Sequence, residues 1–163
     1  KKGSSIEKNS LYTKGMFTVQ DESAMLVSEC LNLRYNDTVL DICSAPGTKG
    51  THVSEILNNT GKVLAFDIHT HKLKLIEDNA KRLGIFNIEV KLGDASKFNR
   101  QYLNSADKIL LDVPCSGLGI IRKKPEIKWT KTLKDLKDIE KEYSRYDPHV
   151  SNFDYSFLFP IYY

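Results

Sequence analysis

Between residues 38 and 113 the chain alternates short apolar runs with helical patterns, and this alternation limits the possible folds more than any other feature. Four strands are expected, over residues 38–42, 62–67, 88–92 and 108–113. Apolar residues at helical spacing separate the first three strands, and Gly84 is placed to end the second of these helices. An earlier helix is expected over residues 23–33. This order predicts an α/β fold with a parallel sheet buried on both faces.

The bulk properties are those of a small, mildly basic globular domain. A chain of 163 residues is long enough for one domain with a sizeable core. The net charge of +3 is compatible with a nucleic-acid partner but is too small to argue for one. Cys30, Cys43 and Cys115 lack the spacing of a zinc site, so we expect no metal and a reducing, cytoplasmic environment. No apolar stretch reaches the roughly 18 residues of a membrane span, so no membrane partner is expected.

Composition divides the chain into three parts. Residues 1–15 are polar and are interpreted as a linker or an arm, and the start at Lys-Lys-Gly without Met is expected of a piece of a longer protein. Residues 144–163 hold seven aromatic residues and a single Lys or Arg, which makes an atypical aromatic tail. The expected domain therefore spans residues 16–143.

The loop after the first strand is built from small residues that let a ligand approach the backbone, and the helix behind it offers free N–H groups. It follows neither the glycine pattern of a dinucleotide site nor that of a P-loop. The candidate ligand-binding residues of this loop are Cys43, Ser44, Ala45, Pro46, Gly47, Thr48 and Lys49.

Four acidic residues stand at or just beyond the ends of the strands. They are Asp41, Asp67, Asp94 and Asp112. Ligands of open parallel sheets bind at this edge, and an acid at the end of the second strand can bind a ribose diol. Any one of them alone would be an ordinary loop aspartate, but four at successive strand ends favour a site.

The segment from Asp112 to Gly117 points to pyrimidine chemistry. Enzymes that methylate exocyclic amines tend to carry paired prolines and an aromatic residue here, whereas this chain has Cys115. Carbon C5 of a pyrimidine is not nucleophilic until a thiolate adds at C6, so a thiol in the pocket suits methylation at C5. The alternative is a small buried hydrophobic residue, which we favour for Cys30 and leave open for Cys43.

Residues 122–129 form a compact basic and aromatic segment with the only Trp of the chain. Phosphate contact and base stacking would both be served by it. The alternative is a solvated loop anchored by that Trp.

Together with residues 16–23, these segments resemble the RNA cytosine-C5 methyltransferases of the RsmB/Sun (Fmu) and NSUN group, and most of all its bacterial branch acting on 16S rRNA. The resemblance runs from about residue 16 to about residue 136. It implies a Rossmann-like class I S-adenosylmethionine-dependent methyltransferase fold, C-terminally incomplete, with S-adenosyl-L-methionine as cofactor. It further implies an RNA partner, expected to be 16S rRNA. The protein is expected to be a monomer.

The resemblance also assigns roles to residues. The loop Cys43 to Lys49 would surround the cofactor, Asp67 would hold its ribose and Asp94 would lie near its adenine. Asp112 would lie near the methyl donor and the target base, as a cofactor-binding and catalytic residue. Cys115 would be a catalytic residue that assists release of the methylated product. The residues that flank the RNA would be Arg122, Lys123, Pro125 and Trp129.

Two departures from the family pattern stand out. Thr48 and Gly50 occupy positions where the family often has Gly and Thr. The family's nucleophile lies in a later Ser-Thr-Cys motif, and this chain has no cysteine after Cys115. We therefore expect a partial catalytic domain that binds the cofactor but does not methylate RNA.

Two rival functions stay open, and a third is disfavoured. Cys115 could itself be the nucleophile, as in DNA cytosine-C5 methyltransferases. The chain could instead be a non-catalytic RNA-binding or scaffold fragment that has lost the cofactor. An NAD-dependent oxidoreductase would need a glycine fingerprint that the chain lacks.

Overall fold

The sheet has four parallel strands in the part of the chain that the structure describes. The computed structural model describes residues 5–97, 99–113 and 115–143, so the predicted tail 144–163 lies outside it. The strands are β1 (Thr38–Asp41), β2 (Lys62–Asp67), β3 (Ile88–Leu92) and β4 (Lys108–Leu110). Their order across the sheet is β3-β2-β1-β4. After β3 the chain crosses back over the sheet, and β4 is added on the free side of β1, still parallel to the other strands. The predicted parallel α/β fold is confirmed.

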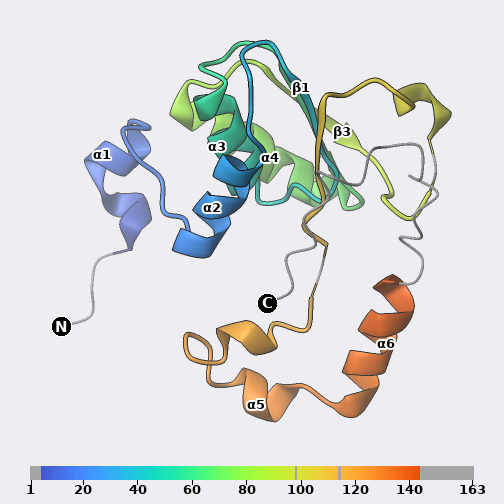
Figure 1. The fold of residues 1–163 in the computed structure, drawn as a ribbon. Coiled ribbons are helices and arrows are strands. Elements are labelled where there is room, and N and C mark those ends of the chain that lie inside the picture. Colours follow the sequence, from blue (N-terminus) through green and yellow to red (C-terminus); the bar gives the residue numbers. More distant parts are fainter. Residues whose placement is uncertain (1–4, 98, 114, 144–163) are drawn as a thin grey trace.

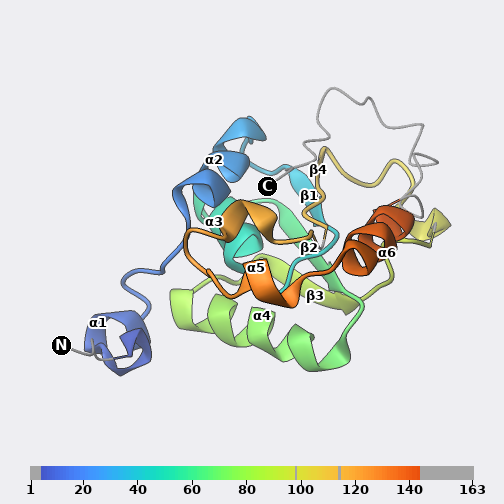
Figure 2. The ribbon, with the colours of Figure 1, turned by 90° about the horizontal axis from the view of Figure 1, so that it is seen from below.

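Three helices cover one face of this sheet (Figures 1 and 2). They are α2 (Glu22–Cys30), α3 (Thr48–Ile56) and α4 (Thr70–Leu83). The side chain of Asp21 caps α2 by accepting from the Ser23 N–H, and Gly84 ends α4 with a φ of 70°. The helix expected over residues 23–33 ends at Cys30. The interpretation of Cys30 as a buried residue was wrong, because the core-facing positions of this helix are Ala24, Val27 and Ser28 and the thiol is exposed.

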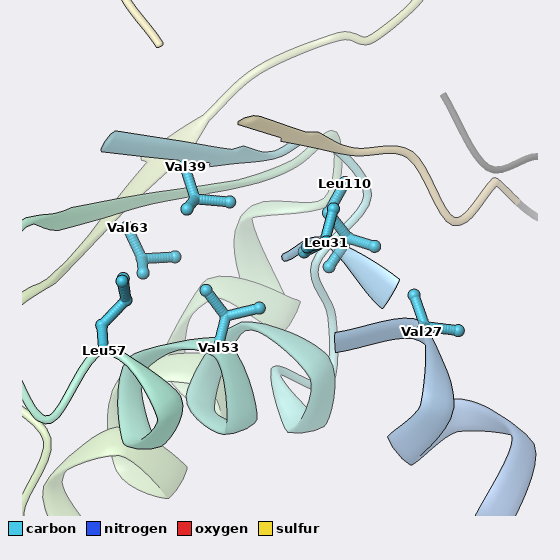
Figure 3. Close-up of a cluster of buried hydrophobic side chains, with 7 residues drawn as sticks. All are labelled: Val27, Leu31, Val39, Val53, Leu57, Val63 and Leu110. Carbon is cyan, nitrogen blue, oxygen red and sulfur yellow. The ribbon is translucent and has the colours of Figure 1, made fainter. Parts of the chain in front are cut away.

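The main core lies between the sheet and α2 and α3. Figure 3 shows side chains of the strands pointing toward side chains of the two helices, and all of them are buried. This cluster contains Val27, Leu31, Val39, Val53, Leu57, Val63 and Leu110. Burial of these aliphatic groups fixes α3 on the sheet, and thereby fixes the loop that leads from β1 into α3.

Leu57 is the natural test of this core, because it is 0 % exposed at the carboxyl end of α3. We expect Leu57→Ala to lower the free energy of unfolding by about 3 kcal/mol, through lost burial and a residual cavity. Urea unfolding measures the change. Leu75→Ala, at a position 51 % exposed on α4, is the matched control and should change stability by less than about 1 kcal/mol. Equal losses in both variants would contradict the assignment of this core.

The other face of the sheet is covered by irregular chain. Leu40, Leu64, Phe66 and Ile109 form its buried cluster, and the Tyr102 ring lies edge-on to Phe66 with centroids 5.0 Å apart. Tyr102 belongs to a short 3-10 helix, η2 (Arg100–Tyr102), in the connection between β3 and β4. Both faces are therefore buried as predicted, but only one of them by α-helices.

The fourth strand is shorter than predicted. Residues 108–113 were expected to be extended, yet β4 ends at Leu110. Its neighbour β1 ends at Asp41. The last backbone hydrogen bond between these two segments is donated by the Ile42 N–H to the Leu110 carbonyl. The chain beyond Leu110 thus leaves the sheet and carries Asp112 toward α3.

The predicted linker or arm contains local structure and is fastened to α4. Its elements are the 3-10 helix η1 (Ile6–Lys8) and α1 (Ser10–Thr13). The Arg82 guanidinium donates to the carbonyls of Tyr12 and Phe17 at 2.8 and 3.0 Å, and it lies over the Tyr12 ring at 3.9 Å. Residues 12–18 are therefore held on the carboxyl end of α4.

The segment after β4 carries η3 (Leu118–Ile120), α5 (Ile127–Thr130) and α6 (Leu133–Tyr143). Figure 1 shows α5 and α6 standing away from the sheet. Among the described residues, no helix is long and apolar enough to cross a membrane.

Candidate active site

The carboxyl ends of the four strands meet along one edge. The Ser44 N–H donates to the Phe66 carbonyl at 2.8 Å, and the Gly93 N–H donates to the Asp67 carbonyl at 3.1 Å. These bonds tie the loop after β1 to β2, and the loop after β3 to β2. Backbone hydrogen bonds therefore fix the loops that follow β1 and β3, next to Asp41 and Asp67 at the strand ends.

The loop after β1 turns tightly into α3. Gly47 is the N-cap of α3 with a φ of 96°, a left-handed conformation that favours glycine, and its N–H donates to the Ser44 carbonyl at 2.7 Å. A Cβ at Gly47 would lie 3.1 Å from Ile76 of α4. The Ala45–Pro46 peptide bond is cis. No side chain caps α3, so the N–H groups of its first turn remain available to a ligand.

Asp41, the last residue of β1, is the most strongly perturbed acid of the site. Its side chain is 1 % exposed, and this burial raises its pKa from 3.8 to about 7. Asp112 and Asp67 add to the rise, while Ser44 and Lys49 oppose it. Ser44 faces the carboxyl group, but Asp41 Oδ2 and Ser44 Oγ do not align as a hydrogen bond of good geometry and have no other partner among the described residues.

Lys49 and Asp112 form the ion pair of the site. The Lys49 Nζ lies 2.5 Å from Asp112 Oδ2, and both side chains are mostly buried. Lys49 extends from the first turn of α3, whereas Asp112 follows the end of β4. Because β4 lies beside β1 in the sheet, the pair joins α3, which follows β1, to the chain that follows β4.

Asp67 and Asp94 differ in the number of neighbouring groups that their side chains bind. Asp67 is buried at the end of β2, and its Oδ1 accepts the His69 N–H at 2.9 Å. Asp94 accepts both the N–H and the hydroxyl of Ser96 and pairs with Lys97 at 3.1 Å. The Ser96 hydroxyl is the main reason that the pKa of Asp94 lies below its usual value.

The two cysteines of the site differ in exposure. Cys43 is half-buried in the loop after β1, and Cys115 is exposed in the segment after Asp112. An exposed thiol at this edge is open to a large substrate.

The basic segment is anchored by an apolar residue and by one ion pair. Ile127 is buried, whereas Trp129 is 87 % exposed, so the Trp is not the anchor. Arg122 and Pro125 are exposed as well. Lys123 pairs with Asp21, the N-cap of α2, and this contact joins the segment to the start of the domain.

The structure thus brings Asp41, Lys49 and Asp112 together, with Asp67 close enough to raise the pKa of Asp41. The Lys49–Asp112 pair and the buried state of Asp41 were missed by sequence reasoning. The sequence does show acids at the ends of β1 and β4. These acids predict a shared charged site only if it is known that the two strands are neighbours in the sheet. The Asp21–Lys123 pair has no local signal in the sequence.

A family model described as 16S rRNA methyltransferase RsmB/F matches residues 28–145. The chain belongs to this family. The match includes all four strands and the candidate site of this RsmB/F family member. The sequence-based recognition of the family, and of its Rossmann-like methyltransferase fold, is confirmed.

Relatives and solved structures agree with this placement. A probable ribosomal RNA small subunit methyltransferase B of Bacillus subtilis is 46 % identical over 121 residues, which are 74 % of this chain and 27 % of that protein. A mouse 28S rRNA (cytosine-C(5))-methyltransferase is 37 % identical over 130 residues, 80 % of this chain and 16 % of that protein. The crystal structure of NSun6 from Pyrococcus horikoshii with SFG has a TM-score of 0.76 and 31 % identity, over 88 % of this chain and 36 % of that one. The chain therefore spans about a quarter of the length of the Bacillus relative.

Proposed function

We propose that this RsmB/F family chain is the cofactor-binding part of an S-adenosylmethionine-dependent enzyme that methylates carbon C5 of cytosine in 16S rRNA. We further propose that the protein is a cytoplasmic monomer. The observation that carries the proposal is the match over residues 28–145, because it spans the loop after β1 together with all four strand-end acids. The names of the relatives support ribosomal RNA as substrate, and those of the bacterial relatives support the small-subunit RNA.

The residues present fit the cofactor. Glycines at positions 47 and 50 keep the backbone of the loop open, and the uncapped first turn of α3 offers N–H donors to a carboxylate. Asp67 at the end of β2 is placed to accept from ribose hydroxyls. The neighbour solved with SFG, an analogue of S-adenosylmethionine, supports the same ligand. We assign the cofactor to residues 43–49 together with Asp67, Asp94 and Asp112.

The proposed chemistry places Asp112 and Cys115 beside the target base. The family's reaction would begin when a thiolate, from the later Ser-Thr-Cys motif that this chain lacks, adds to C6 of cytosine. The bound cofactor would supply the methyl group to C5, and loss of the C5 proton would release the thiolate. We assign Cys115 to this last step and Asp112 to orientation of the base and the methyl donor. Lys49 holds the Asp112 carboxyl group in place through the 2.5 Å pair.

Titration calorimetry with S-adenosylhomocysteine tests cofactor binding directly. We expect heat of binding from the chain, and an affinity at least tenfold lower for Asp67→Asn, in which a neutral amide replaces the acceptor for the ribose. Binding of RNA without any heat from S-adenosylhomocysteine would instead support the scaffold function. A covalent adduct with fluorocytosine DNA that is lost in Cys115→Ser would support Cys115 as the nucleophile.

The RNA surface makes a prediction about two neighbouring lysines. Lys123 is paired with Asp21, whereas the exposed Lys124 forms no ion pair with any described residue. The salt dependence is the slope of the logarithm of the RNA-binding constant against the logarithm of the salt concentration. We expect Lys124→Met to reduce the magnitude of this slope by about 0.7, the value for one phosphate contact of a single strand. Lys123→Met should change it by much less, since Asp21 already neutralises that charge. Filter binding at several salt concentrations measures both slopes, and a larger change for Lys123→Met would contradict the prediction.

A further inference from the structure

The carboxyl group of Asp41 lies buried beneath the proposed cofactor loop, within a group of fixed charges. The charged groups that act on it are Asp112 after β4, Lys49 on α3 and Asp67 on β2. A single lysine thus faces three carboxyl groups. Asp41 Oδ2 has no hydrogen bond among the described residues, and neither has the nearby Ser44 Oγ.

Gly50 brings α3 into direct contact with this carboxyl group. A Cβ at Gly50 would lie 2.8 Å from Asp41 Oδ2 and 3.3 Å from Ser44 Oγ. The tip of Asp41 therefore rests against the first turn of α3, the turn that carries Lys49 and the free N–H groups. Because Gly50 and the Asp41 carboxyl group lie in direct contact, a charge on Asp41 is felt at the loop 43–49 through protein of low dielectric constant.

The cofactor and its product differ by one charge. S-adenosylmethionine carries a positive sulfonium, and S-adenosylhomocysteine carries a neutral thioether in its place. When Asp41 is neutral, the site contains one lysine and two carboxylates. When Asp41 is ionised, it contains one lysine and three carboxylates. The second state is the better environment for a cation and offers nothing to the thioether.

We propose that Asp41 is a positioning residue whose ionised form distinguishes the sulfonium cofactor from the neutral thioether product. This inference rests on the proposed cofactor site. By linkage, binding of the sulfonium releases a proton from Asp41 to solvent, and conversion to the thioether lets Asp41 take a proton back from solvent. The charge lost by the ligand on methyl transfer is thus compensated at Asp41, and the product is held less tightly than the donor.

The test compares the two ligands over pH. Burial sets the pKa of free Asp41 at about 7, so its charge changes between pH 5 and pH 8. We expect the ratio of the dissociation constant of S-adenosylhomocysteine to that of S-adenosylmethionine to rise about tenfold over this range in the unmodified chain, which corresponds to a pKa shift of about one unit. Asp41→Asn keeps the shape without the charge, and its ratio should follow only the titration of the ligands and of the other groups.

A second readout needs no variant. Calorimetry at pH 7 in two buffers of different ionisation enthalpy should reveal proton release when S-adenosylmethionine binds, and less or none when S-adenosylhomocysteine binds. Equal proton release for both ligands, or the same pH dependence in Asp41→Asn, would overturn the role of Asp41 while leaving the cofactor site intact. Failure of both ligands to bind at any pH would overturn the proposed function and this inference with it.

Discussion

Replacing Asp41 by Asn is expected to raise the free energy of unfolding at pH 8 by as much as about 4 kcal/mol. Burial raises the pKa of Asp41 from 3.8 to about 7, so between these two pH values the folded chain holds a proton that the unfolded chain has already released. The stability linked to this proton is fully present below pH 3.8 and is lost as pH rises through about 7. A difference of about three pKa units corresponds to about 4 kcal/mol. The neutral amide removes the loss at high pH.

Urea unfolding at pH 4, 6 and 8 measures this effect. The advantage of Asp41→Asn should grow from near zero at pH 4 to its full value at pH 8. Asp78→Asn, on the exposed side of α4, is the matched control and should stay within about 0.5 kcal/mol of the unmodified chain at each pH. An equal pH dependence in both variants would show that Asp41 is ionised at no unusual cost.

The second large effect is expected at Gly47. Replacing it by Ala should lower the free energy of unfolding by about 2–3 kcal/mol, because a side chain is strained at a φ of 96° and its Cβ would lie 3.1 Å from Ile76. The same change displaces the loop that precedes α3. We therefore expect affinity for S-adenosylhomocysteine to fall by at least tenfold, since donors that move by about an ångström lose much of their alignment.

Gly84 provides the matched control for this variant. It also has a positive φ, of 70°, but nothing lies within 4 Å of its would-be Cβ. Gly84→Ala should therefore lower stability by only about 1 kcal/mol and leave calorimetric affinity unchanged. If both variants lose stability equally and neither loses affinity, the close packing of the loop against α4 has no part in ligand binding.

The regular elements of the sheet could be predicted from the sequence, whereas its contacts could not. The strands Lys62–Asp67 and Ile88–Leu92 were predicted with their observed bounds. The first is mainly apolar, the second alternates apolar and charged residues, and both lie between clear helix and turn signals. The end of β4 was placed at residue 113 instead of Leu110, since the apolar run continues although the partner strand does not. Strand length there depends on β1, which the local pattern does not reveal.

The candidate site shows the same division. Acids at strand ends were recognised from spacing alone, because every parallel strand ends at the same edge. The pairing of Lys49 with Asp112, and the burial of Asp41 between them, depend on β4 lying beside β1 after the reversal in strand order. Sixty-three residues separate the two partners of that pair, so no local rule relates them. The roles proposed for Asp112 and Cys115 come from the family resemblance.

The hydrogen bonds between Arg82 and residues 12–18 determine when this N-terminal arm can dock on α4 during synthesis. The Arg82 side chain and the Tyr12 carbonyl that it binds are 70 residues apart in the chain. At roughly 5–20 residues per second, the ribosome adds Arg82 between about 4 and 14 s after Tyr12. The arm thus emerges first but can dock only after Arg82 has been added, by which time all residues of α2 and α3 have been synthesised.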